Sequence, residues 1–378
     1  MKYILLGFFL RLLVAIWNGF FGPSIGADGD ALLFHDIAVE VSRFGVFDTK
    51  FNIGWLYSYF LGIIYFLTTL NSIFLGSVLS CLAWLASALI LNKSIKLLGV
   101  DQKYRDRALI LYAIIPSSIL FTSVTLREVY QLLFVNLLFF SSLKILLEGN
   151  HKFWFLILIS SFCMGALHFG LVLYGILGAL ITLYFTSIKD GKILSIELIL
   201  FYIPLLSLFI YLGLNLFDQL VPFDFEDGLA AAVQSYQSGH NETRAMYTYK
   251  PEIEGLIGLI IFIPISLFQY LLEPMPWKIS TSLDIALFFE NIFRVALIIF
   301  AINNLLKVKS YLKTPLVYSI LMFFALEILW ALGTVNWGSA VRHHIPAMGI
   351  LMIIGICFLD PNLRSKKIVK RLNKQYKV

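Results

Sequence analysis

The sequence predicts an all-α integral membrane protein. Hydrophobic residues make up 59% of the 378 residues and charged residues only 14%, against about 25% charged in an average soluble domain. The mean hydropathy is +0.85. Apolar runs of about 20 residues recur along the chain, which is the length that a helix needs to cross the hydrocarbon layer. Because no water reaches the backbone there, each run has to satisfy its own hydrogen bonds, and a helix does so.

We expect about ten transmembrane helices. The runs that we interpret as spans are 3–21, 72–92, 107–123, 128–147, 153–167, 169–187, 194–217, 283–303, 315–332 and 344–360. Two further apolar stretches, 53–70 and 255–273, leave the count open. If both cross, there are twelve spans, and Lys93–Arg107, with five basic residues, faces outward. If neither crosses, this segment faces the cytoplasm with the other basic segments, as the positive-inside rule requires. We therefore expect these two stretches to skim the outer leaflet.

The distribution of charge predicts how the chain is divided. Residues 1–361 form a polytopic transmembrane domain, and residues 362–378 form a basic cytoplasmic tail, because seven of the 29 Lys and Arg lie beyond Asp360. The two long loops 22–52 and 218–254 face outward and hold twelve of the 23 acidic residues. The net charge of +6 therefore indicates contact with anionic membrane lipid and no nucleic-acid partner.

Asp28 and Asp30 are the first candidate catalytic residues. They directly follow the first span, and the apolar pattern from Ala31 onward predicts a short interfacial helix. An Asp at the N-cap of such a helix is common, so Asp30 has a structural explanation. A carboxylate beside an outward-facing site can also accept a proton from an incoming hydroxyl group.

Glu128 is the third candidate catalytic residue, and Arg127 precedes it at the boundary of two apolar helices. Ionisable residues at that depth are costly and usually face the interior of the bundle. The alternative is an ion pair between the two at a helix end. His168 lies in the break between two short apolar segments, and we interpret it as an interior His with satisfied hydrogen bonds.

Arg342, His343 and His344 form the third constellation, at the outer end of the last span. A planar guanidinium group beside imidazoles suits a phosphate. The His pair could instead bind a metal, but no third ligand is close in sequence, so a divalent metal is possible and the cofactor stays unknown. Lys250 and Lys278, in or near the second outer loop, are further candidates for substrate binding.

The sequence contains neither a Walker loop nor a GxGxxG motif after a strand. No cytoplasmic segment is long enough to hold a domain for a nucleotide sugar. A transferase built on this chain has to take its activated donor from the membrane itself.

Four short motifs of this sequence resemble motifs of a known protein family. They are Asp30-Ala31-x-x-Phe34-x-x-x-Ala38, Gly54-Trp-Leu-Tyr57, Pro116-Ser117 through Arg127-Glu128, and Asn336-x-Gly338-x-x-x-Arg342-His343. They are similar to motifs of the bacterial GT-C glycosyltransferases related to the protein O-mannosyltransferases (glycosyltransferase family 39). Phe34 stands where the family usually has Tyr, and the large periplasmic C-terminal domain of some members is missing.

The resemblance implies a GT-C-like bundle with membrane-skimming outer-loop helices in the cell (inner) membrane, with its active site on the extracytoplasmic side. It implies the transfer of a sugar from a polyprenyl-phosphate donor to a glycan, lipid or protein acceptor. Asp30, with Asp28 nearby, would be the base, Arg342 with Arg127 and His343 would hold the phosphate, and Glu128 would orient the acceptor.

Two other functions compete with this one. A Wzy-type polymerase of lipid-linked polysaccharide repeat units also has ten or more spans and large outer loops. A transporter or flippase of lipid-linked saccharides is the alternative of another class. Transporters usually show internal repeats and broken helices near the midplane, whereas the ionisable residues here gather at the outer surface.

Overall fold

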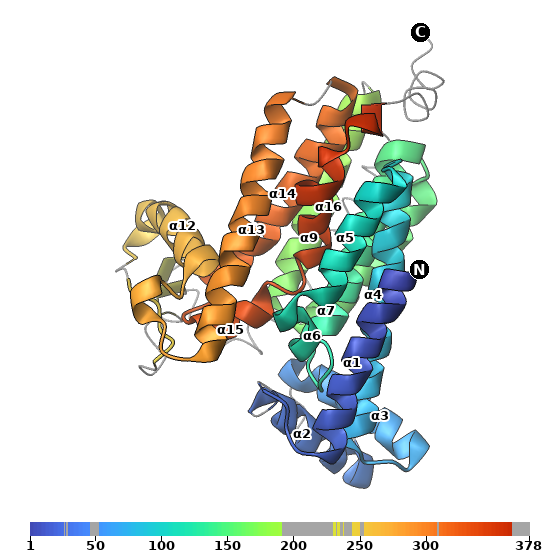
Figure 1. Ribbon diagram of the computed structural model, residues 1–378, viewed down its shortest axis with the longest axis vertical. Helices are drawn as coiled ribbons and strands as arrows, with labels where there is room; N and C mark the ends of the chain where they lie inside the picture. Colours follow the sequence, from blue (N-terminus) through green and yellow to red (C-terminus); the bar gives the residue numbers. More distant parts are fainter. Residues whose placement is uncertain are drawn as a thin grey trace.

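The computed structural model describes residues 1–25, 27, 29–45, 53–190, 230–231, 233–234, 237, 244–249, 253–307 and 310–364. Figure 1 shows a bundle of helices, most of which run along the long axis of the molecule. Within the described residues there is no β-strand, and one isolated antiparallel bridge joins Met246 to Asn336. The predicted all-α architecture is therefore confirmed for this part of the chain.

Seven helices among the described residues are long and apolar enough to cross a membrane. They are α1 (Lys2–Phe20), α4 (Ile73–Leu97), α7 (Glu128–Glu148), α9 (Gly170–Asp190), α12 (Gly255–Leu272), α13 (Ser282–Lys307) and α14 (Ser310–Leu332). The count becomes eight if α15 (Trp337–His343) and α16 (Met348–Ile356), whose axes are bent by 74° at their junction, form one span. The chain is thus a multi-pass membrane protein.

Five further helices within the described ranges are shorter. They are α2 (Asp30–Phe44), α3 (Leu56–Thr68), α5 (Gln102–Ile114), α6 (Pro116–Phe121) and α8 (Trp154–Leu167). In Figure 1, α2, α3, α6 and α15 all lie in the lower half of the molecule, whereas the red ribbon that follows α16 lies at the top. The turn between α4 and α5 lies beside the C-terminal end of the last helix, because the backbone N–H of Asp101 donates to Oδ2 of Asp360 at 2.7 Å.

The spans differ from the predicted ones in several places. The run 107–123 is not one helix: α5 ends at Ile114 and α6 begins at Pro116, since proline lacks an N–H and its ring clashes with the preceding turn. The stretch 53–70 contains only the 13 residues of α3, but α12 in 255–273 is long enough to cross. The predicted span 194–217 lies outside the described residues, as does most of the basic tail. The count of ten spans therefore stays a prediction.

Arg11, in the middle of α1, holds this proline break in place. Its guanidinium group is fully buried and lies over the ring of Trp84, 3.7 Å from the ring centroid. It donates to Oγ of Ser118 at 2.8 Å and Oγ1 of Thr122 at 2.7 Å, both in or beside α6, and to the carbonyl oxygen of Ala113 at 3.0 Å. One buried cation thus joins α1 to both sides of the break, and α6 leads directly into the segment that carries Arg127 and Glu128.

Candidate functional site

Asp30 and Arg342 meet, although 312 residues separate them in the sequence. Nη1 of Arg342 donates to Oδ2 of Asp30 at 2.7 Å. The side chain of Asp30 is 52% exposed and that of Arg342 is 19% exposed. Asp30 is the first helical residue of α2, Gly29 is the N-cap, and no side chain caps the helix. The carboxylate of Asp30 therefore faces α15 instead of serving as the expected N-cap.

The position of Arg342 depends on how α15 is anchored. The side chain of Asn336 caps this helix, with Oδ1 accepting from the backbone N–H of Ser339 at 2.7 Å. The next residue, Trp337, donates its backbone N–H to the carbonyl oxygen of Ala245 at 3.0 Å and its indole N–H to Asp284 at 3.2 Å. The start of α15 is thus fixed to α13 and to the second outer loop.

Glu128 is the first residue of α7, and only 5% of it is exposed. Its Oε2 atom is buried and has no hydrogen-bond partner among the described residues. Glu128 and Asp30 both interact electrostatically with Arg342. A carboxylate at the N-terminus of a helix is stabilised by the helix dipole, and the Oε2 atom of Glu128 is available to a ligand.

Arg127 connects α2 to the break between α8 and α9. Its Nη1 atom donates to the carbonyl oxygen of Leu167 at 3.1 Å. Its guanidinium group lies 5.5 Å from the ring centroid of Phe34, one turn after Asp30. Two residues before Arg127, the hydroxyl group of Thr125 donates to the carbonyl oxygen of Ala31 at 2.7 Å. Asp30, Arg127 and Glu128 are therefore held in one framework by contacts of their immediate neighbours.

The two adjacent histidines of α15 have different surroundings. His343 bonds through Nδ1 to Oγ1 of Thr334 at 2.7 Å and stacks on Trp330, with ring centroids 4.1 Å apart. His344 is buried, with Nδ1 2.9 Å from Oε2 of Glu327 and Nε2 3.0 Å from the carbonyl oxygen of Tyr270. His343 interacts electrostatically with Arg342 and Arg127. It therefore belongs to the site around Asp30, whereas His344 joins α12, α14 and α15 in the core.

His168 also contacts Trp330, and it differs from the predicted His with satisfied hydrogen bonds. Its ring centroid is 4.7 Å from that of Trp330. Its Nδ1 atom is buried and has no hydrogen-bond partner among the described residues. Burial, with a smaller contribution from Arg127, lowers the pKa of His168 to about 3, so that its ring is neutral at physiological pH. One ring nitrogen of this His is thus left without a partner by the part of the chain that the structure describes.

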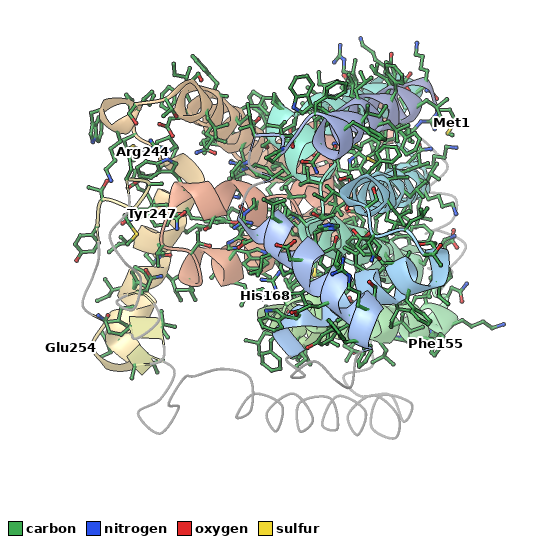
Figure 2. All side chains as sticks on the ribbon, turned by 90° about the horizontal axis from the view of Figure 1, so that it is seen from below. Met1, Phe155, His168, Arg244, Tyr247 and Glu254 are labelled. Carbon is green, nitrogen blue, oxygen red and sulfur yellow. The ribbon has the colours of Figure 1, made fainter. Side chains whose placement is uncertain are left out.

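Lys278 lies in a separate network. Its Nζ atom is 3.3 Å from Oε2 of Glu273 and 3.0 Å from the carbonyl oxygen of Met246, and it lies over the ring of Trp337 at 5.2 Å. Figure 2 shows the neighbouring Arg244 and Tyr247 on the side of the molecule away from Phe155. Lys278 therefore fixes the second outer loop to α15, and nothing brings it to Asp30. Asp28 and Lys250 lie outside the described residues.

A metal site is not evident in the described part of the chain. No group of three or more His, Cys, Asp or Glu side chains there could hold a metal ion. The His343–His344 pair does not supply two ligands to one ion, since the two rings have different partners.

Sequence reasoning did not select Arg11, Thr125, Trp330 or Glu327. Arg11 and Glu327 each carry a signal that could have identified them, because a charged residue in the middle of an apolar run is rare and usually faces a partner. Thr125 and Trp330 carry no such signal, since their importance follows only from the segments that the fold brings beside them.

No family model matches this chain, and neither a curated protein nor a solved structure does. The resemblance to GT-C glycosyltransferases therefore depends on the four short motifs.

Proposed function

We propose that this protein is a membrane glycosyltransferase of the GT-C type. It moves a sugar from a polyprenyl-phosphate donor to an acceptor at the membrane surface. The observation that carries this proposal is the pair of Asp30 and Arg342, a half-exposed carboxylate and a guanidinium group in contact at the same end of the bundle. Glycosyl transfer from a phosphate donor uses both functions in one site: a base for the acceptor and a cation for the leaving phosphate.

The proposed reaction assigns each group a role. The acceptor hydroxyl oxygen forms a bond to the anomeric carbon, and the bond from that carbon to the phosphate oxygen breaks. The hydroxyl proton passes to the carboxylate of Asp30, and the charge that develops on the phosphate is stabilised by Arg342, with Arg127 and His343 nearby. The unpartnered oxygen of Glu128 binds a second hydroxyl group of the acceptor.

The contact between Asp30 and Arg342 suggests an order of events. A phosphate is a stronger ligand for a guanidinium group than a half-exposed carboxylate, because it offers more acceptor oxygens and more charge. Donor binding would draw Arg342 from Asp30 and leave that carboxylate free to accept the proton. The resting pair would thus be separated only when the donor is in place.

The distribution of charge supports a site on the outer side of the membrane. The turn between α4 and α5 belongs to the basic segment Lys93–Arg107 and lies beside Asp360, whereas α2 and α15 lie at the other end (Figure 1). Because basic segments stay on the cytoplasmic side, the pair of Asp30 and Arg342 would face outward.

A transfer assay tests the proposal against its two rivals. The purified protein in lipid nanodiscs would receive, in separate reactions, a sugar on polyprenyl phosphate together with a glycan acceptor, or saccharide repeat units on polyprenyl diphosphate. The released lipid and the glycosylated product would be measured in each reaction. Stepwise addition of one sugar supports the proposal. Release of polyprenyl diphosphate with chains of whole repeat units would identify a polymerase. Movement of an intact lipid-linked saccharide across a liposome membrane, without product, would identify a transporter.

A further inference from the structure

Two buried polar atoms, at the break between α8 and α9 and on the adjacent end of α14, have no hydrogen-bond partner within the described ranges. One is Nδ1 of His168 and the other is Nε1 of Trp330, whose side chain is only 3% exposed. The two rings are in edge contact, with centroids 4.7 Å apart, and His343 stacks on the indole at 4.1 Å. A buried donor without a partner costs about 1–3 kcal/mol, so these two atoms indicate a ligand or ordered water.

The groups around these atoms decide which kind of ligand fits. An indole N–H and a guanidinium group only donate hydrogen bonds, and an imidazole nitrogen can donate. Arg127 interacts electrostatically with both His168 and His343, and Arg342 interacts with His343. A ligand at this place therefore meets mostly donors and two cations. Such a set selects an anion with several acceptor oxygens, of which phosphate is the common example.

Two helix N-termini also lie near this place. Arg127 directly precedes α7 and donates to the carbonyl oxygen of Leu167, which is the last residue of α8. The next helix, α9, begins three residues later at Gly170. The N-termini of α7 and α9 therefore lie close together, and their positive partial charge offsets the negative partial charge of the α8 C-terminus beside them. Figure 2, which views the molecule from below, shows His168 between the blue N-terminal helices and the orange C-terminal helices.

We propose that the phosphate of a lipid phosphate binds here, with Nδ1 of His168 and Nε1 of Trp330 as ligands beside Arg127 and Arg342. This inference deepens the proposed function and depends on it for the identity of the lipid, a polyprenyl phosphate. His168 and Trp330 are then binding residues. They come from two helix ends that carry none of the catalytic carboxylates.

Binding of polyprenyl phosphate to the full chain in nanodiscs tests this inference. Trp330→Phe keeps an aromatic ring beside the two imidazoles, and it removes the N–H together with one of the two fused rings of the indole. A hydrogen bond to a charged group contributes about 1.5–3 kcal/mol, so this change is expected to raise the Kd for polyprenyl phosphate by roughly tenfold or more. Trp277→Phe, at an exposed tryptophan of the turn between α12 and α13, is the matched control and should bind as the wild type does. His168→Gln should also bind more weakly, and His151→Gln, at an exposed His, should not.

Two further ligands identify the source of the phosphate. Polyprenol, which has the same chain without the phosphate, should bind weakly and equally to wild type and Trp330→Phe. Inorganic phosphate should compete only weakly, because it lacks the lipid chain. Equal binding of polyprenyl phosphate by wild type, Trp330→Phe and His168→Gln would overturn the inference, as would binding of inorganic phosphate without binding of the lipid.

The transfer assay separates this inference from the proposed function. If polyprenyl phosphate binding depends on Trp330 but no sugar is transferred, the phosphate site stands and the transferase does not. If sugar is transferred and its KM for the donor is unchanged by Trp330→Phe and His168→Gln, the phosphate lies elsewhere and this inference fails.

Discussion

Replacing Arg11 by Met tests how the candidate site is held together. Met has a similar length and fills the space beside Trp84 with apolar atoms, but it removes every hydrogen bond that the guanidinium group makes to α5 and α6. Removing a buried charge also removes a desolvation cost, so the exchange of a buried ion for an apolar side chain can be neutral. The outcome depends on which polar groups lose their partners.

The carbonyl oxygen of Ala113 is the group that decides the magnitude. In an uninterrupted helix it would accept from the N–H of Ser117, but this N–H donates to Oε1 of Glu290 at 2.9 Å. The hydroxyl group of Thr122 keeps a bond to the carbonyl oxygen of Ser118. Arg11→Met therefore leaves Ala113 without the donor that Arg11 supplies, and Ser118 and Thr122 lose theirs. An unsatisfied buried group costs about 1–3 kcal/mol, and hydrogen bonds in membrane proteins average about 0.6 kcal/mol.

We expect Arg11→Met to lower the free energy of unfolding by about 2 kcal/mol, the sum of one orphaned carbonyl group and two lost bonds, reduced by the relieved desolvation. Unfolding in mixed micelles by increasing SDS measures this value. Arg107→Met, at an exposed arginine of α5, is the control and should unfold as the wild type does. Wild-type stability of Arg11→Met would refute the role of Arg11 at the break, and Arg11→Lys should give an intermediate value because it keeps the charge without the planar group.

Three further predictions concern the site and the topology. Arg342→Ala should raise the KM for the lipid donor by roughly tenfold or more, the loss of a charged hydrogen bond, and an unchanged KM would place the phosphate away from α15. Glu128→Gln should leave the stability unchanged or higher, since it neutralises a buried carboxylate, while transfer falls; a loss of folding instead would make Glu128 a structural residue. A cysteine at Gln102, in a chain without the three native cysteines, should not react with a membrane-impermeant reagent added from outside, and efficient labelling would reverse the topology.

The helical spans were largely predictable from the sequence because each depends on its own composition. Long apolar runs predicted α1 and α7 to within one residue at each end. They also predicted α4, α13 and α14, but α4 and α13 extend five and four residues further at their C-terminal ends, and α14 begins five residues earlier. The breaks were harder to predict. Pro116 interrupts a helix, as proline does in general, but Pro264 lies inside α12, which continues through it. Whether neighbouring groups satisfy the freed backbone decides between the two, and those neighbours are distant in sequence.

The sequence allowed the candidate residues to be selected, but it did not allow their contact partners to be predicted. Asp30 was expected to cap its own helix, but the fold brings α15 against it, and the ion pair with Arg342 follows from that contact. His343 and His344 are adjacent in sequence, yet successive residues of a helix point about 100° apart, which explains why one faces Trp330 and the other Glu327. Arg127 and Glu128 were both predicted as site residues because they lie at a helix boundary, and α7 does begin at Glu128 with Arg127 as its N-cap.

The most direct test of the proposed function compares two aspartates of α2. Asp30→Asn keeps the size of the side chain but removes the proton acceptor, and general-base catalysis typically contributes about 10²–10⁴-fold to a rate. Asp36→Asn, six residues along the same helix at an exposed position, is the matched control. The account predicts that Asp30→Asn lowers kcat for sugar transfer by at least about a hundredfold, with wild-type folding, while Asp36→Asn stays active. Full activity of Asp30→Asn would contradict it.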